Sequence, residues 1–294
     1  MAFESWKEEV IAADVQHQLP KALVYGQLGV INRNYEGDVQ RAKSVRIVGV
    51  GEVSTFDVVH GQDMPSPQSV QDTSLEMTID YDKGFCYSVD YLDEAQTKID
   101  IMSELNIEAT YGVADAIDQT IASCYVDASA ANLIGSDAAP KTPNMTQGDA
   151  SNVFNLLVDC ATKLADSKVP RSMPKWIIVP PAFGGLLTKD AKLIGGAAPG
   201  VSTEGILNGM IGRYAGFTIL ESHNVPCVTA ADGTKSKYKL LFGTSKAITY
   251  ADQLSKIRFM EMEKQFGKKV DGEFVWGRKV VRPEYLGVMT CNFS

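Results

Sequence analysis

Between residues 45 and 91, valines and aromatic residues alternate with polar residues, and this period of two predicts β-strands. One strand is expected over 45–59 and a return strand over 74–81. The stretch between them, HGQDMPSPQS (60–69), is polar and contains two prolines, which is typical of a turn. The pattern therefore predicts a long two-stranded arm with a proline-stiffened tip and little core of its own.

Two further hairpins are predicted from turn dipeptides flanked by alternating residues. The first turns at Asp82-Lys83-Gly84, between the strand at 74–81 and a strand at 85–91. The second turns at Asp271-Gly272, in a C-terminal region that also holds an alternating stretch at 256–263 and a final strand.

Helical periodicity dominates two segments of the chain. Residues 5–19 place apolar side chains at helical spacing and stop before Pro20. A much longer helix is predicted from Glu94 to Tyr125, with a capping box of Asp93 and Gln96 at its start. At about 1.5 Å per residue this helix would be close to 50 Å long, which suits a structural rod.

An α/β pattern follows a small, polar, proline-containing boundary at 135–148. It comprises an amphipathic helix at 149–165, a buried strand at 176–179, a helix beginning at PAFGGLL and later short strands at 216–220 and 238–251. The amphipathic helix should turn a set of apolar residues inward: Val153, Leu156, Leu157, Cys160 and Leu164. Because the C-terminal strands need partners from before this region, the α/β region is expected to interrupt another domain.

Composition describes a globular protein of 294 residues, 45% hydrophobic, with a formal net charge of −8. Such acidity argues against nucleic-acid binding through the whole surface, because phosphate binding relies on cations. The five cysteines are widely spaced and form no CxxC, so free thiols in a reducing compartment are expected rather than disulfides or a zinc site. No stretch is apolar enough for a membrane helix, and the acidic N-terminal sequence does not resemble a signal peptide.

Catalytic and cofactor patterns are weak throughout the chain. The three histidines, His17, His60 and His223, lie in unrelated segments. VGVGEVS (48–54) lacks the third glycine and the following helix of a dinucleotide site, and the glycine-rich stretch 194–217 lacks the GKS or GKT of a phosphate loop. We therefore expect no catalytic, metal or cofactor site, and interpret 194–217 as a mobile loop.

Charge is distributed unevenly between two regions. Residues 93–127 hold eight acids and one lysine, whereas residues 256–282 hold eight bases and four acids. Both regions could simply be solvated faces, or they could be complementary within or between subunits.

Taken in order, these segments resemble a tailed-bacteriophage major capsid protein over essentially the whole chain. The similarity is carried by NYEGDV before the long arm, FCYSVDYLDEAQ, the long helix, PKWIIVPPAFGGLL, GFTILESHNVP, LLFGTSKAITYADQL and FGKKVDGEFVWGRKVVRPEYLGVM. The resemblance implies an α+β fold shared with herpesvirus capsid floors and encapsulins. It divides the chain into an N-terminal arm (1–44), an extended loop (45–91), a peripheral domain (92–135 and 250–294) built on the long spine helix, and an inserted axial α/β domain (136–249).

By this resemblance the protein is not an enzyme but assembles into pentamers and hexamers of an icosahedral shell around double-stranded DNA. The expected contacts between subunits are the loop tip (His60, Gln62, Asp63, Met64, Pro65, Pro67) and a charged pairing of Asp100, Glu104 and Glu108 with Lys268 and Lys269. Gly195, Gly196 and Gly200 would lie at the centre of each pentamer or hexamer.

The expected partners are other copies of the chain, a separate scaffolding protein, a portal protein and a decoration protein, with no membrane involved. The expected location is the virion shell, assembled in the host cytoplasm. Because residues 44–82 contain no lysine, no isopeptide cross-link from the extended loop is expected. An encapsulin-type compartment is the alternative, and a soluble α/β enzyme is a more remote one.

Overall fold

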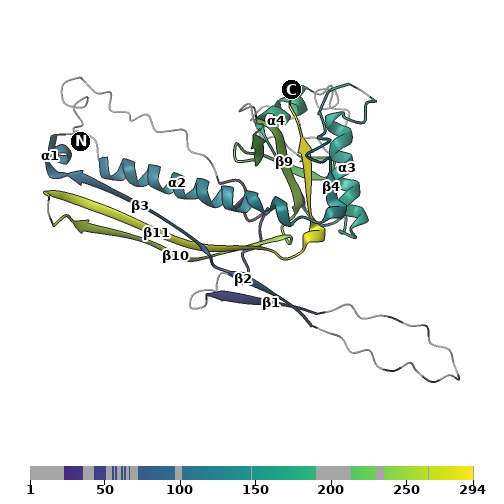
Figure 1. Ribbon diagram of the computed structural model, residues 1–294, viewed down its shortest axis with the longest axis horizontal. Helices are drawn as coiled ribbons and strands as arrows, with labels where there is room; N and C mark the ends of the chain where they lie inside the picture. Colours follow the sequence, from purple (N-terminus) through teal and green to yellow (C-terminus); the bar gives the residue numbers. More distant parts are fainter. Residues whose placement is uncertain are drawn as a thin grey trace.

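The computed structural model describes residues 23–35, 43–50, 72–96, 101–146, 148–189, 213–229, 235–263 and 265–293, together with residues 55, 57, 61, 63 and 66. Figure 1 shows an elongated molecule with two units, a compact one holding α3 (Val153–Asp166) and α4 (Pro181–Lys189) and a long one holding α2 (Ile101–Ala122) and its sheet, beside which lies the strand pair of β1 (Ser44–Val50) and β2 (Asp72–Thr78). Within the described residues, no helix is long and apolar enough to cross a membrane.

The compact unit is built on a seven-stranded mixed sheet in the order β4-β12-β9-β5-β7-β6, with β8 paired to β9. Its strands are β4 (Leu133–Ile134), β5 (Lys175–Val179), β6 (Arg213–Tyr214), β7 (Phe217–Glu221), β8 (Cys227–Thr229), β9 (Lys235–Thr244) and β12 (Leu286–Cys291). The helices α3 (Val153–Asp166) and α4 (Pro181–Lys189) pack with it.

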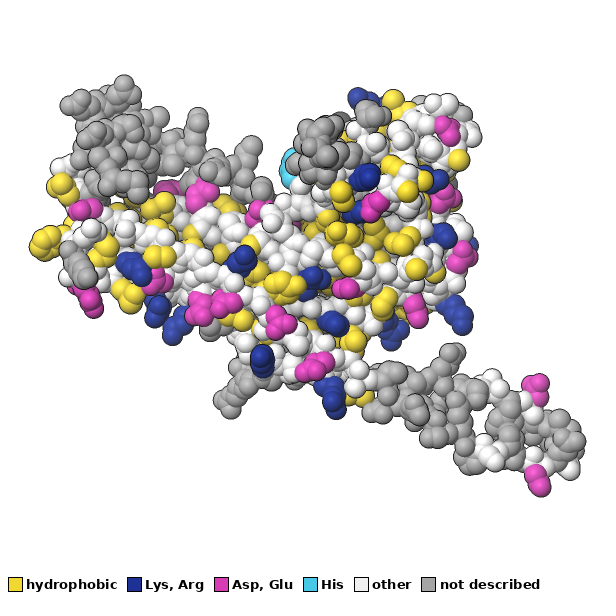
Figure 2. Space-filling model, in the orientation of Figure 1, with side chains coloured by type: hydrophobic (Ala, Val, Ile, Leu, Met, Phe, Trp, Pro, Cys, Tyr) yellow, Lys and Arg dark blue, Asp and Glu magenta, His cyan; other side chains and the backbone are white. Residues whose placement is uncertain are grey.

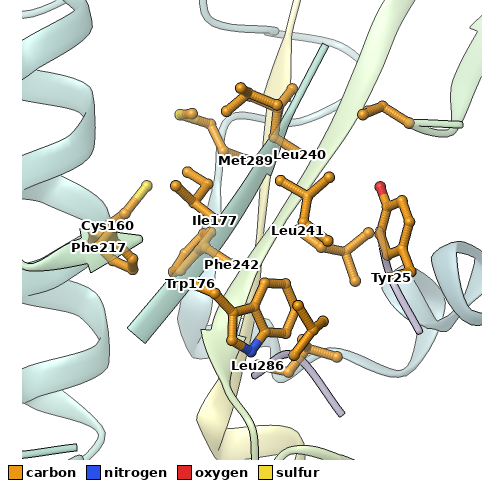
Figure 3. Packing of buried hydrophobic residues seen from close by; sticks show 14 of the residues in the cluster. Tyr25, Cys160, Trp176, Ile177, Phe217, Leu240, Leu241, Phe242, Leu286 and Met289 are labelled. Carbon is orange, nitrogen blue, oxygen red and sulfur yellow. The ribbon is translucent and has the colours of Figure 1, made fainter. Parts of the chain in front are cut away.

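Both faces of this sheet are covered, because every residue of β5 and β12 is buried. Figure 3 shows Cys160 of α3 on one side of the sheet and Tyr25 on the other, with Ile177, Leu241 and Phe242 between them. The five inward residues predicted for the amphipathic helix are the buried residues of α3, so that prediction is confirmed. Asn152 caps this helix by accepting a hydrogen bond from the N–H of Phe154.

The long unit is a three-stranded antiparallel sheet in the order β10-β11-β3, with α2 lying along one face. Its elements are β3 (Tyr81–Asp90), β10 (Ile248–Glu261), β11 (Gly267–Val280), α1 (Tyr91–Gln96) and α2 (Ile101–Ala122). The Tyr87 hydroxyl donates to Oδ1 of Asn106 at 2.5 Å, and the rings of Tyr81 and Trp276 stack at 6.3 Å. The expected partnership of the C-terminal strands with the long helix is therefore confirmed.

The arm begins as an antiparallel pair of β1 (Ser44–Val50) and β2 (Asp72–Thr78). Its root has a small core of its own: the buried residues Val45, Ile47, Met77, Ile79 and Ala251 form a separate cluster. The pairing of the two strands agrees with the predicted arm, but the expectation of little core is wrong at the root, where β10 supplies Ala251 as a packing partner.

Neither predicted turn at Asp82-Lys83-Gly84 nor at Asp271-Gly272 exists. Both segments lie inside strands, β3 and β11, which pair with each other so that Gly272 is opposite Phe85 and Glu273 is opposite Gly84. A Cβ on Gly272 would lie 2.3 Å from the Phe85 ring, and one on Gly84 would lie 2.9 Å from the carbonyl oxygen of Gly272. Glycine is needed here for close approach between strands, not for a turn.

The predicted long helix is helical in its described parts but ends earlier than predicted. The structure describes α1, then α2 from Ile101 to Ala122, and a 3₁₀ turn, η3 (Ser123–Asp127), replaces the last three predicted residues of the helix; residues 97–100, between α1 and α2, lie outside the described residues. The predicted cap is also misplaced, because the N–H of Leu92 donates to Oδ1 of Asp90 and the helix already includes Asp93. At 22 residues, α2 is about 33 Å long.

The last strand, β12, belongs to the seven-stranded sheet, where it pairs with β9 and β4. The sequence grouped its residues with β10 and β11 instead. The 3₁₀ turn η5 (Pro283–Tyr285) leads into β12, and the 3₁₀ turn η4 (Ala130–Asn132) leads into its parallel neighbour β4. Asn132 fixes this junction, since its side-chain amide donates to the carbonyl oxygens of Glu284 and Leu286.

Candidate functional site

Chemistry-bearing side chains do not converge in the described part of the chain. Among those residues, no three His, Cys, Asp or Glu side chains are close enough to hold a metal ion. All five cysteines are free thiols, and burial raises the pKa of Cys124 to about 11 and that of Cys291 to about 12. Such thiols stay protonated near neutral pH and are poor nucleophiles. The candidate functional features of the described residues are therefore surfaces.

The arm is the first of these surfaces. Of its predicted tip residues, Asp63 is exposed, as is Gly61, which has a positive φ of 91°. The other five, His60, Gln62, Met64, Pro65 and Pro67, lie outside the described residues. The glycines predicted at the centre of a ring of subunits, Gly195, Gly196 and Gly200, lie outside them too, as does the predicted helix at 5–19.

The predicted charged pairing is only partly visible, because Asp100 is outside the described residues. Lys268 and Lys269 point to opposite faces of the sheet, as neighbours in a strand must. Lys268 lies over the ring of Tyr91, with Nζ 5.8 Å from its centroid, on the face that carries α2. Glu104 and Glu108 lie on that helix.

Lys269 lies on the other face, in a cluster of charges shared by β10 and β11. Its Nζ is 3.0 Å from Oδ1 of Asp271, and Nη2 of Arg258 is 3.5 Å from Oδ2 of the same residue. The hydrogen bonds from Cys86 and Lys269 hold the pKa of Asp271 below its usual value. The Lys269 ammonium therefore already has a carboxylate partner within its own strand.

Large apolar side chains are exposed at the end of the three-stranded sheet. Phe259 of β10 is 64% exposed, and Phe266, in the turn between β10 and β11, is 86% exposed. Ile257 and Met260 are also exposed, and Leu92 of α1 is exposed at the same end of the unit. Figure 2 shows hydrophobic side chains at the surface there, on the left of the view. Exposed apolar groups gathered at one end of a protein mark an interaction surface.

A single carboxylate holds the segment that precedes the arm. Asp118 of α2 is fully buried, and its two oxygens accept hydrogen bonds from the N–H groups of Val24 (2.8 Å) and Gly26 (3.1 Å). Burial raises the pKa of Asp118, and the hydrogen bonds from this segment oppose that shift. The sequence grouped Asp118 with the other acids of the helix. One sequence signal for the burial of Asp118 was available. Ile121 and Ala122, three and four positions later and so on the same face of the helix, are apolar.

A groove lies between this segment and the root of the arm. It has a volume of about 1220 Å³ and is lined by residues 28–35, by β1 and β2, and by the turns that follow β9 and β11. The apolar side chains of Leu28, Ile47, Val48 and Leu75 line it, and Lys246, Arg282 and Glu284 add charges. No sequence pattern indicated this groove, because its walls come from five separate segments of the chain.

A family described as phage capsid protein has a model that matches residues 73–288. Solved structures share the fold: one of Mycobacterium phage Che8 has a TM-score of 0.74 at 23% identity, covering 98% of each chain. The capsid structure of the cyanophage P-SCSP1u has a TM-score of 0.73 at 17% identity, covering 99% of this chain and 94% of that one. The cyanophage Pam1 capsid has a TM-score of 0.69 at 13% identity, covering 100% and 99%. No curated protein matches the sequence.

Proposed function

The chain belongs to the phage capsid protein family and is a major capsid protein with the tailed-phage capsid fold, and we propose that it assembles into pentamers and hexamers of an icosahedral shell around double-stranded DNA. The observation that supports this most is the family match over residues 73–288, which includes both units and the return strand of the arm. The role is structural, and the formal charge of −8 would keep packaged DNA from adhering to the wall.

In this proposal, each region of the chain corresponds to one part of the family's capsid fold. Residues 1–44 act as an N-terminal arm, 45–91 as the extended loop, 92–135 and 250–294 as the peripheral domain, and 136–249 as the axial domain. We place β12 structurally in the axial sheet, because it pairs there. The loop around Gly195, Gly196 and Gly200 lies at the centre of each pentamer or hexamer in this proposal.

The extended loop lands on a neighbouring subunit in the proposed shell. Beyond the small cluster at the root of the arm, its strands have few apolar groups to bury, so a neighbour must supply their packing partner. Hydrogen exchange compares the unassembled protein with the shell. Amides at residues 58–70 should exchange slowly only in the shell, whereas equal protection in both forms would count against this landing.

Electron microscopy of the purified, concentrated protein tests the function itself. Closed shells are the expected result, and a protein that stays monomeric with and without a scaffolding protein would refute the proposal. The nucleic acid inside shells purified from infected cells gives the second test. Nuclease-protected double-stranded DNA supports a phage head, and enclosed protein cargo without DNA would point to an encapsulin-type compartment. Further proposed partners are a scaffolding protein, a portal protein and a decoration protein, with assembly in the host cytoplasm.

The charged pairing between subunits is tested by reversing one lysine at a time. Lys268→Glu places an acid on the sheet face that carries α2, the helix to which Glu104 and Glu108 belong, and should impair assembly of a normally folded monomer. Lys269→Glu removes the ion pair with Asp271 on the opposite face of the three-stranded sheet. Comparing the two variants therefore shows which face of the sheet contributes to assembly. The matched control is Lys163→Glu on the exposed side of α3. Normal particles from both strand variants would exclude this pairing.

A further inference from the structure

The groove at the root of the arm has walls that are held in place before any partner arrives. The N–H of Asn32 donates to the carbonyl oxygen of Ile248 at 2.9 Å, and the N–H of Tyr250 donates to that of Asn32 at 3.0 Å. The guanidinium of Arg33 lies over the Tyr250 ring, 5.3 Å from its centroid, and donates to the Gly26 carbonyl oxygen. Segment 23–35 is therefore fastened to β10, and the groove is a fixed feature of the surface.

Two large apolar side chains line this groove while remaining open to solvent. Leu28 is 75% exposed and Val48 is 61% exposed, and they come from the two sides of the groove, residues 28–35 and β1. The volume, about 1220 Å³, exceeds the 300–1,000 Å³ typical of small-molecule pockets. Its size and open apolar lining fit a polypeptide segment.

The rim of the groove carries an excess of positive charge. Three bases, Arg33, Lys246 and Arg282, and one acid, Glu284, line the groove, and neither Lys246 nor Arg282 forms an ion pair with a carboxylate among the described residues. Arg282 contacts the Tyr285 ring instead. A complementary partner would therefore bring acidic and apolar side chains together.

The chain itself contains such a segment. Residues 3–15 read FESWKEEVIAADV, with acids at 4, 8, 9 and 14 against one base, Lys7, and with Trp6, Val10, Ile11 and Val15 at helical spacing. An amphipathic segment with apolar anchors and an acidic side is what a partly apolar, cationic groove binds. Its structure lies outside the described residues.

A second copy is the better source of this segment than the same chain. Asp118 ties Val24 and Gly26 to α2, and neither residue lines the groove, so the described chain begins at residue 23 beside that helix. Figure 1 shows the segment that follows passing from α2 toward β1 and β2, where the groove lies. We propose that this groove receives residues 3–15 of a second copy, an inference that rests on the proposed shell assembly and names one of its contacts.

Disulfide trapping in assembled particles tests the proposal. All chains carry Cys86→Ser, which removes the exposed native thiol. One chain also carries Val10→Cys and the other Val48→Cys, and the two are assembled together and oxidised with glutathione disulfide. Mass spectrometry of the linked peptides should find the 10–48 link between different chains. The matched control replaces Val48→Cys with Val126→Cys, another exposed valine far from the groove in sequence, and should give no link.

Each other outcome overturns the proposal. A 10–48 link found only when both cysteines are on one chain would assign the groove to the chain's own segment. A link from Val48→Cys to Asp63→Cys of another chain would show that the extended loop occupies the groove. If no link exceeds the control, residues 3–15 do not bind in the groove. If particles fail to form from wild-type protein, the proposed function fails. If normal particles form without the 10–48 link, the contact between residues 3–15 and the groove is refuted, and the proposed shell assembly still stands.

Charge exchange provides the second measurement. Lys246→Glu together with Arg282→Glu should lower the yield of the link between chains by about twofold to fivefold, the range expected for solvent-exposed ion pairs. Glu8→Lys with Glu9→Lys in the partner chain should restore it. If the yield of the link stays the same in both sets of charge reversals, the proposed charge complementarity is contradicted.

Discussion

Removal of the Asp118 carboxylate should loosen the segment that joins the N-terminal arm to the spine helix α2. Asp118→Ala leaves the N–H groups of Val24 and Gly26 buried without their acceptor, at about 1–3 kcal/mol each. We therefore expect a loss of roughly 2–6 kcal/mol in the free energy of unfolding. Asp118→Asn keeps the shape and one acceptor oxygen, so its loss should be about half as large.

Urea denaturation of the unassembled protein measures these losses, with Asp127→Ala as a control at an exposed acid near the end of the same helical region. The control should change stability by less than about 0.5 kcal/mol. Limited proteolysis should also cleave the Asp118→Ala variant faster near residue 23. If Asp118→Ala unfolds like wild type, the carboxylate does not hold this segment and the reasoning is refuted.

The pH dependence of the same variants follows from the raised pKa of Asp118. Because burial raises this pKa above the ordinary value of 3.8, the folded protein binds the proton more tightly than the unfolded chain. Wild type should therefore gain stability relative to Asp118→Asn as the pH falls through the raised pKa toward 3.8. Denaturation curves at several pH values measure the difference in the free energy of unfolding between wild type and Asp118→Asn. A difference that becomes smaller as the pH falls would contradict this prediction.

Three other substitutions test the packing and the charges of the described residues by urea denaturation. Gly272→Ala forces a Cβ against the Phe85 ring and should cost about 1–3 kcal/mol. Gly112 lies on α2 with nothing near an added Cβ, so Gly112→Ala should instead raise the free energy of unfolding by about 0.5–1 kcal/mol. If Gly272→Ala stabilises the protein and Gly112→Ala destabilises it, both predictions are refuted. Asp137→Asn loses the ion pair with Lys239, which lowers the pKa of Asp137. It should be less stable than wild type by about 0.5–1 kcal/mol at neutral pH, with the difference vanishing as the pH falls through that lowered pKa.

The elements that sequence predicted well are those whose burial is uniform along their length. In α3, the apolar residues at helical spacing face one core, and Asn152 supplies a local cap, so periodicity and structure agree. In β5, an unbroken apolar run matches a strand covered on both faces. Local signals are reliable where neighbouring segments do not compete with them.

The failed turns show how a tertiary contact overrides a local signal. Asp271-Gly272 has the composition of a hairpin turn, but the Phe85 ring lies where a side chain on residue 272 would be, and the glycine lies within the antiparallel pair of β3 and β11. The actual turn between β10 and β11 is closed by the N–H of Met262, which donates to the carbonyl oxygen of Gly267. Asp118 and the groove were missed for a related reason, because their partners lie far away in the sequence.

The exposed residues of β10 give one further argument for assembly. This strand has 14 residues and forms an edge of its sheet, and its apolar residues Ile257 and Phe259 are substantially exposed. An isolated protein with such an edge risks indiscriminate strand pairing. Lys256 and Arg258 alternate with these residues, so any approaching strand meets two positive charges as well as the apolar surface. A partner must satisfy both at once, which favours one defined neighbour in a shell over random association.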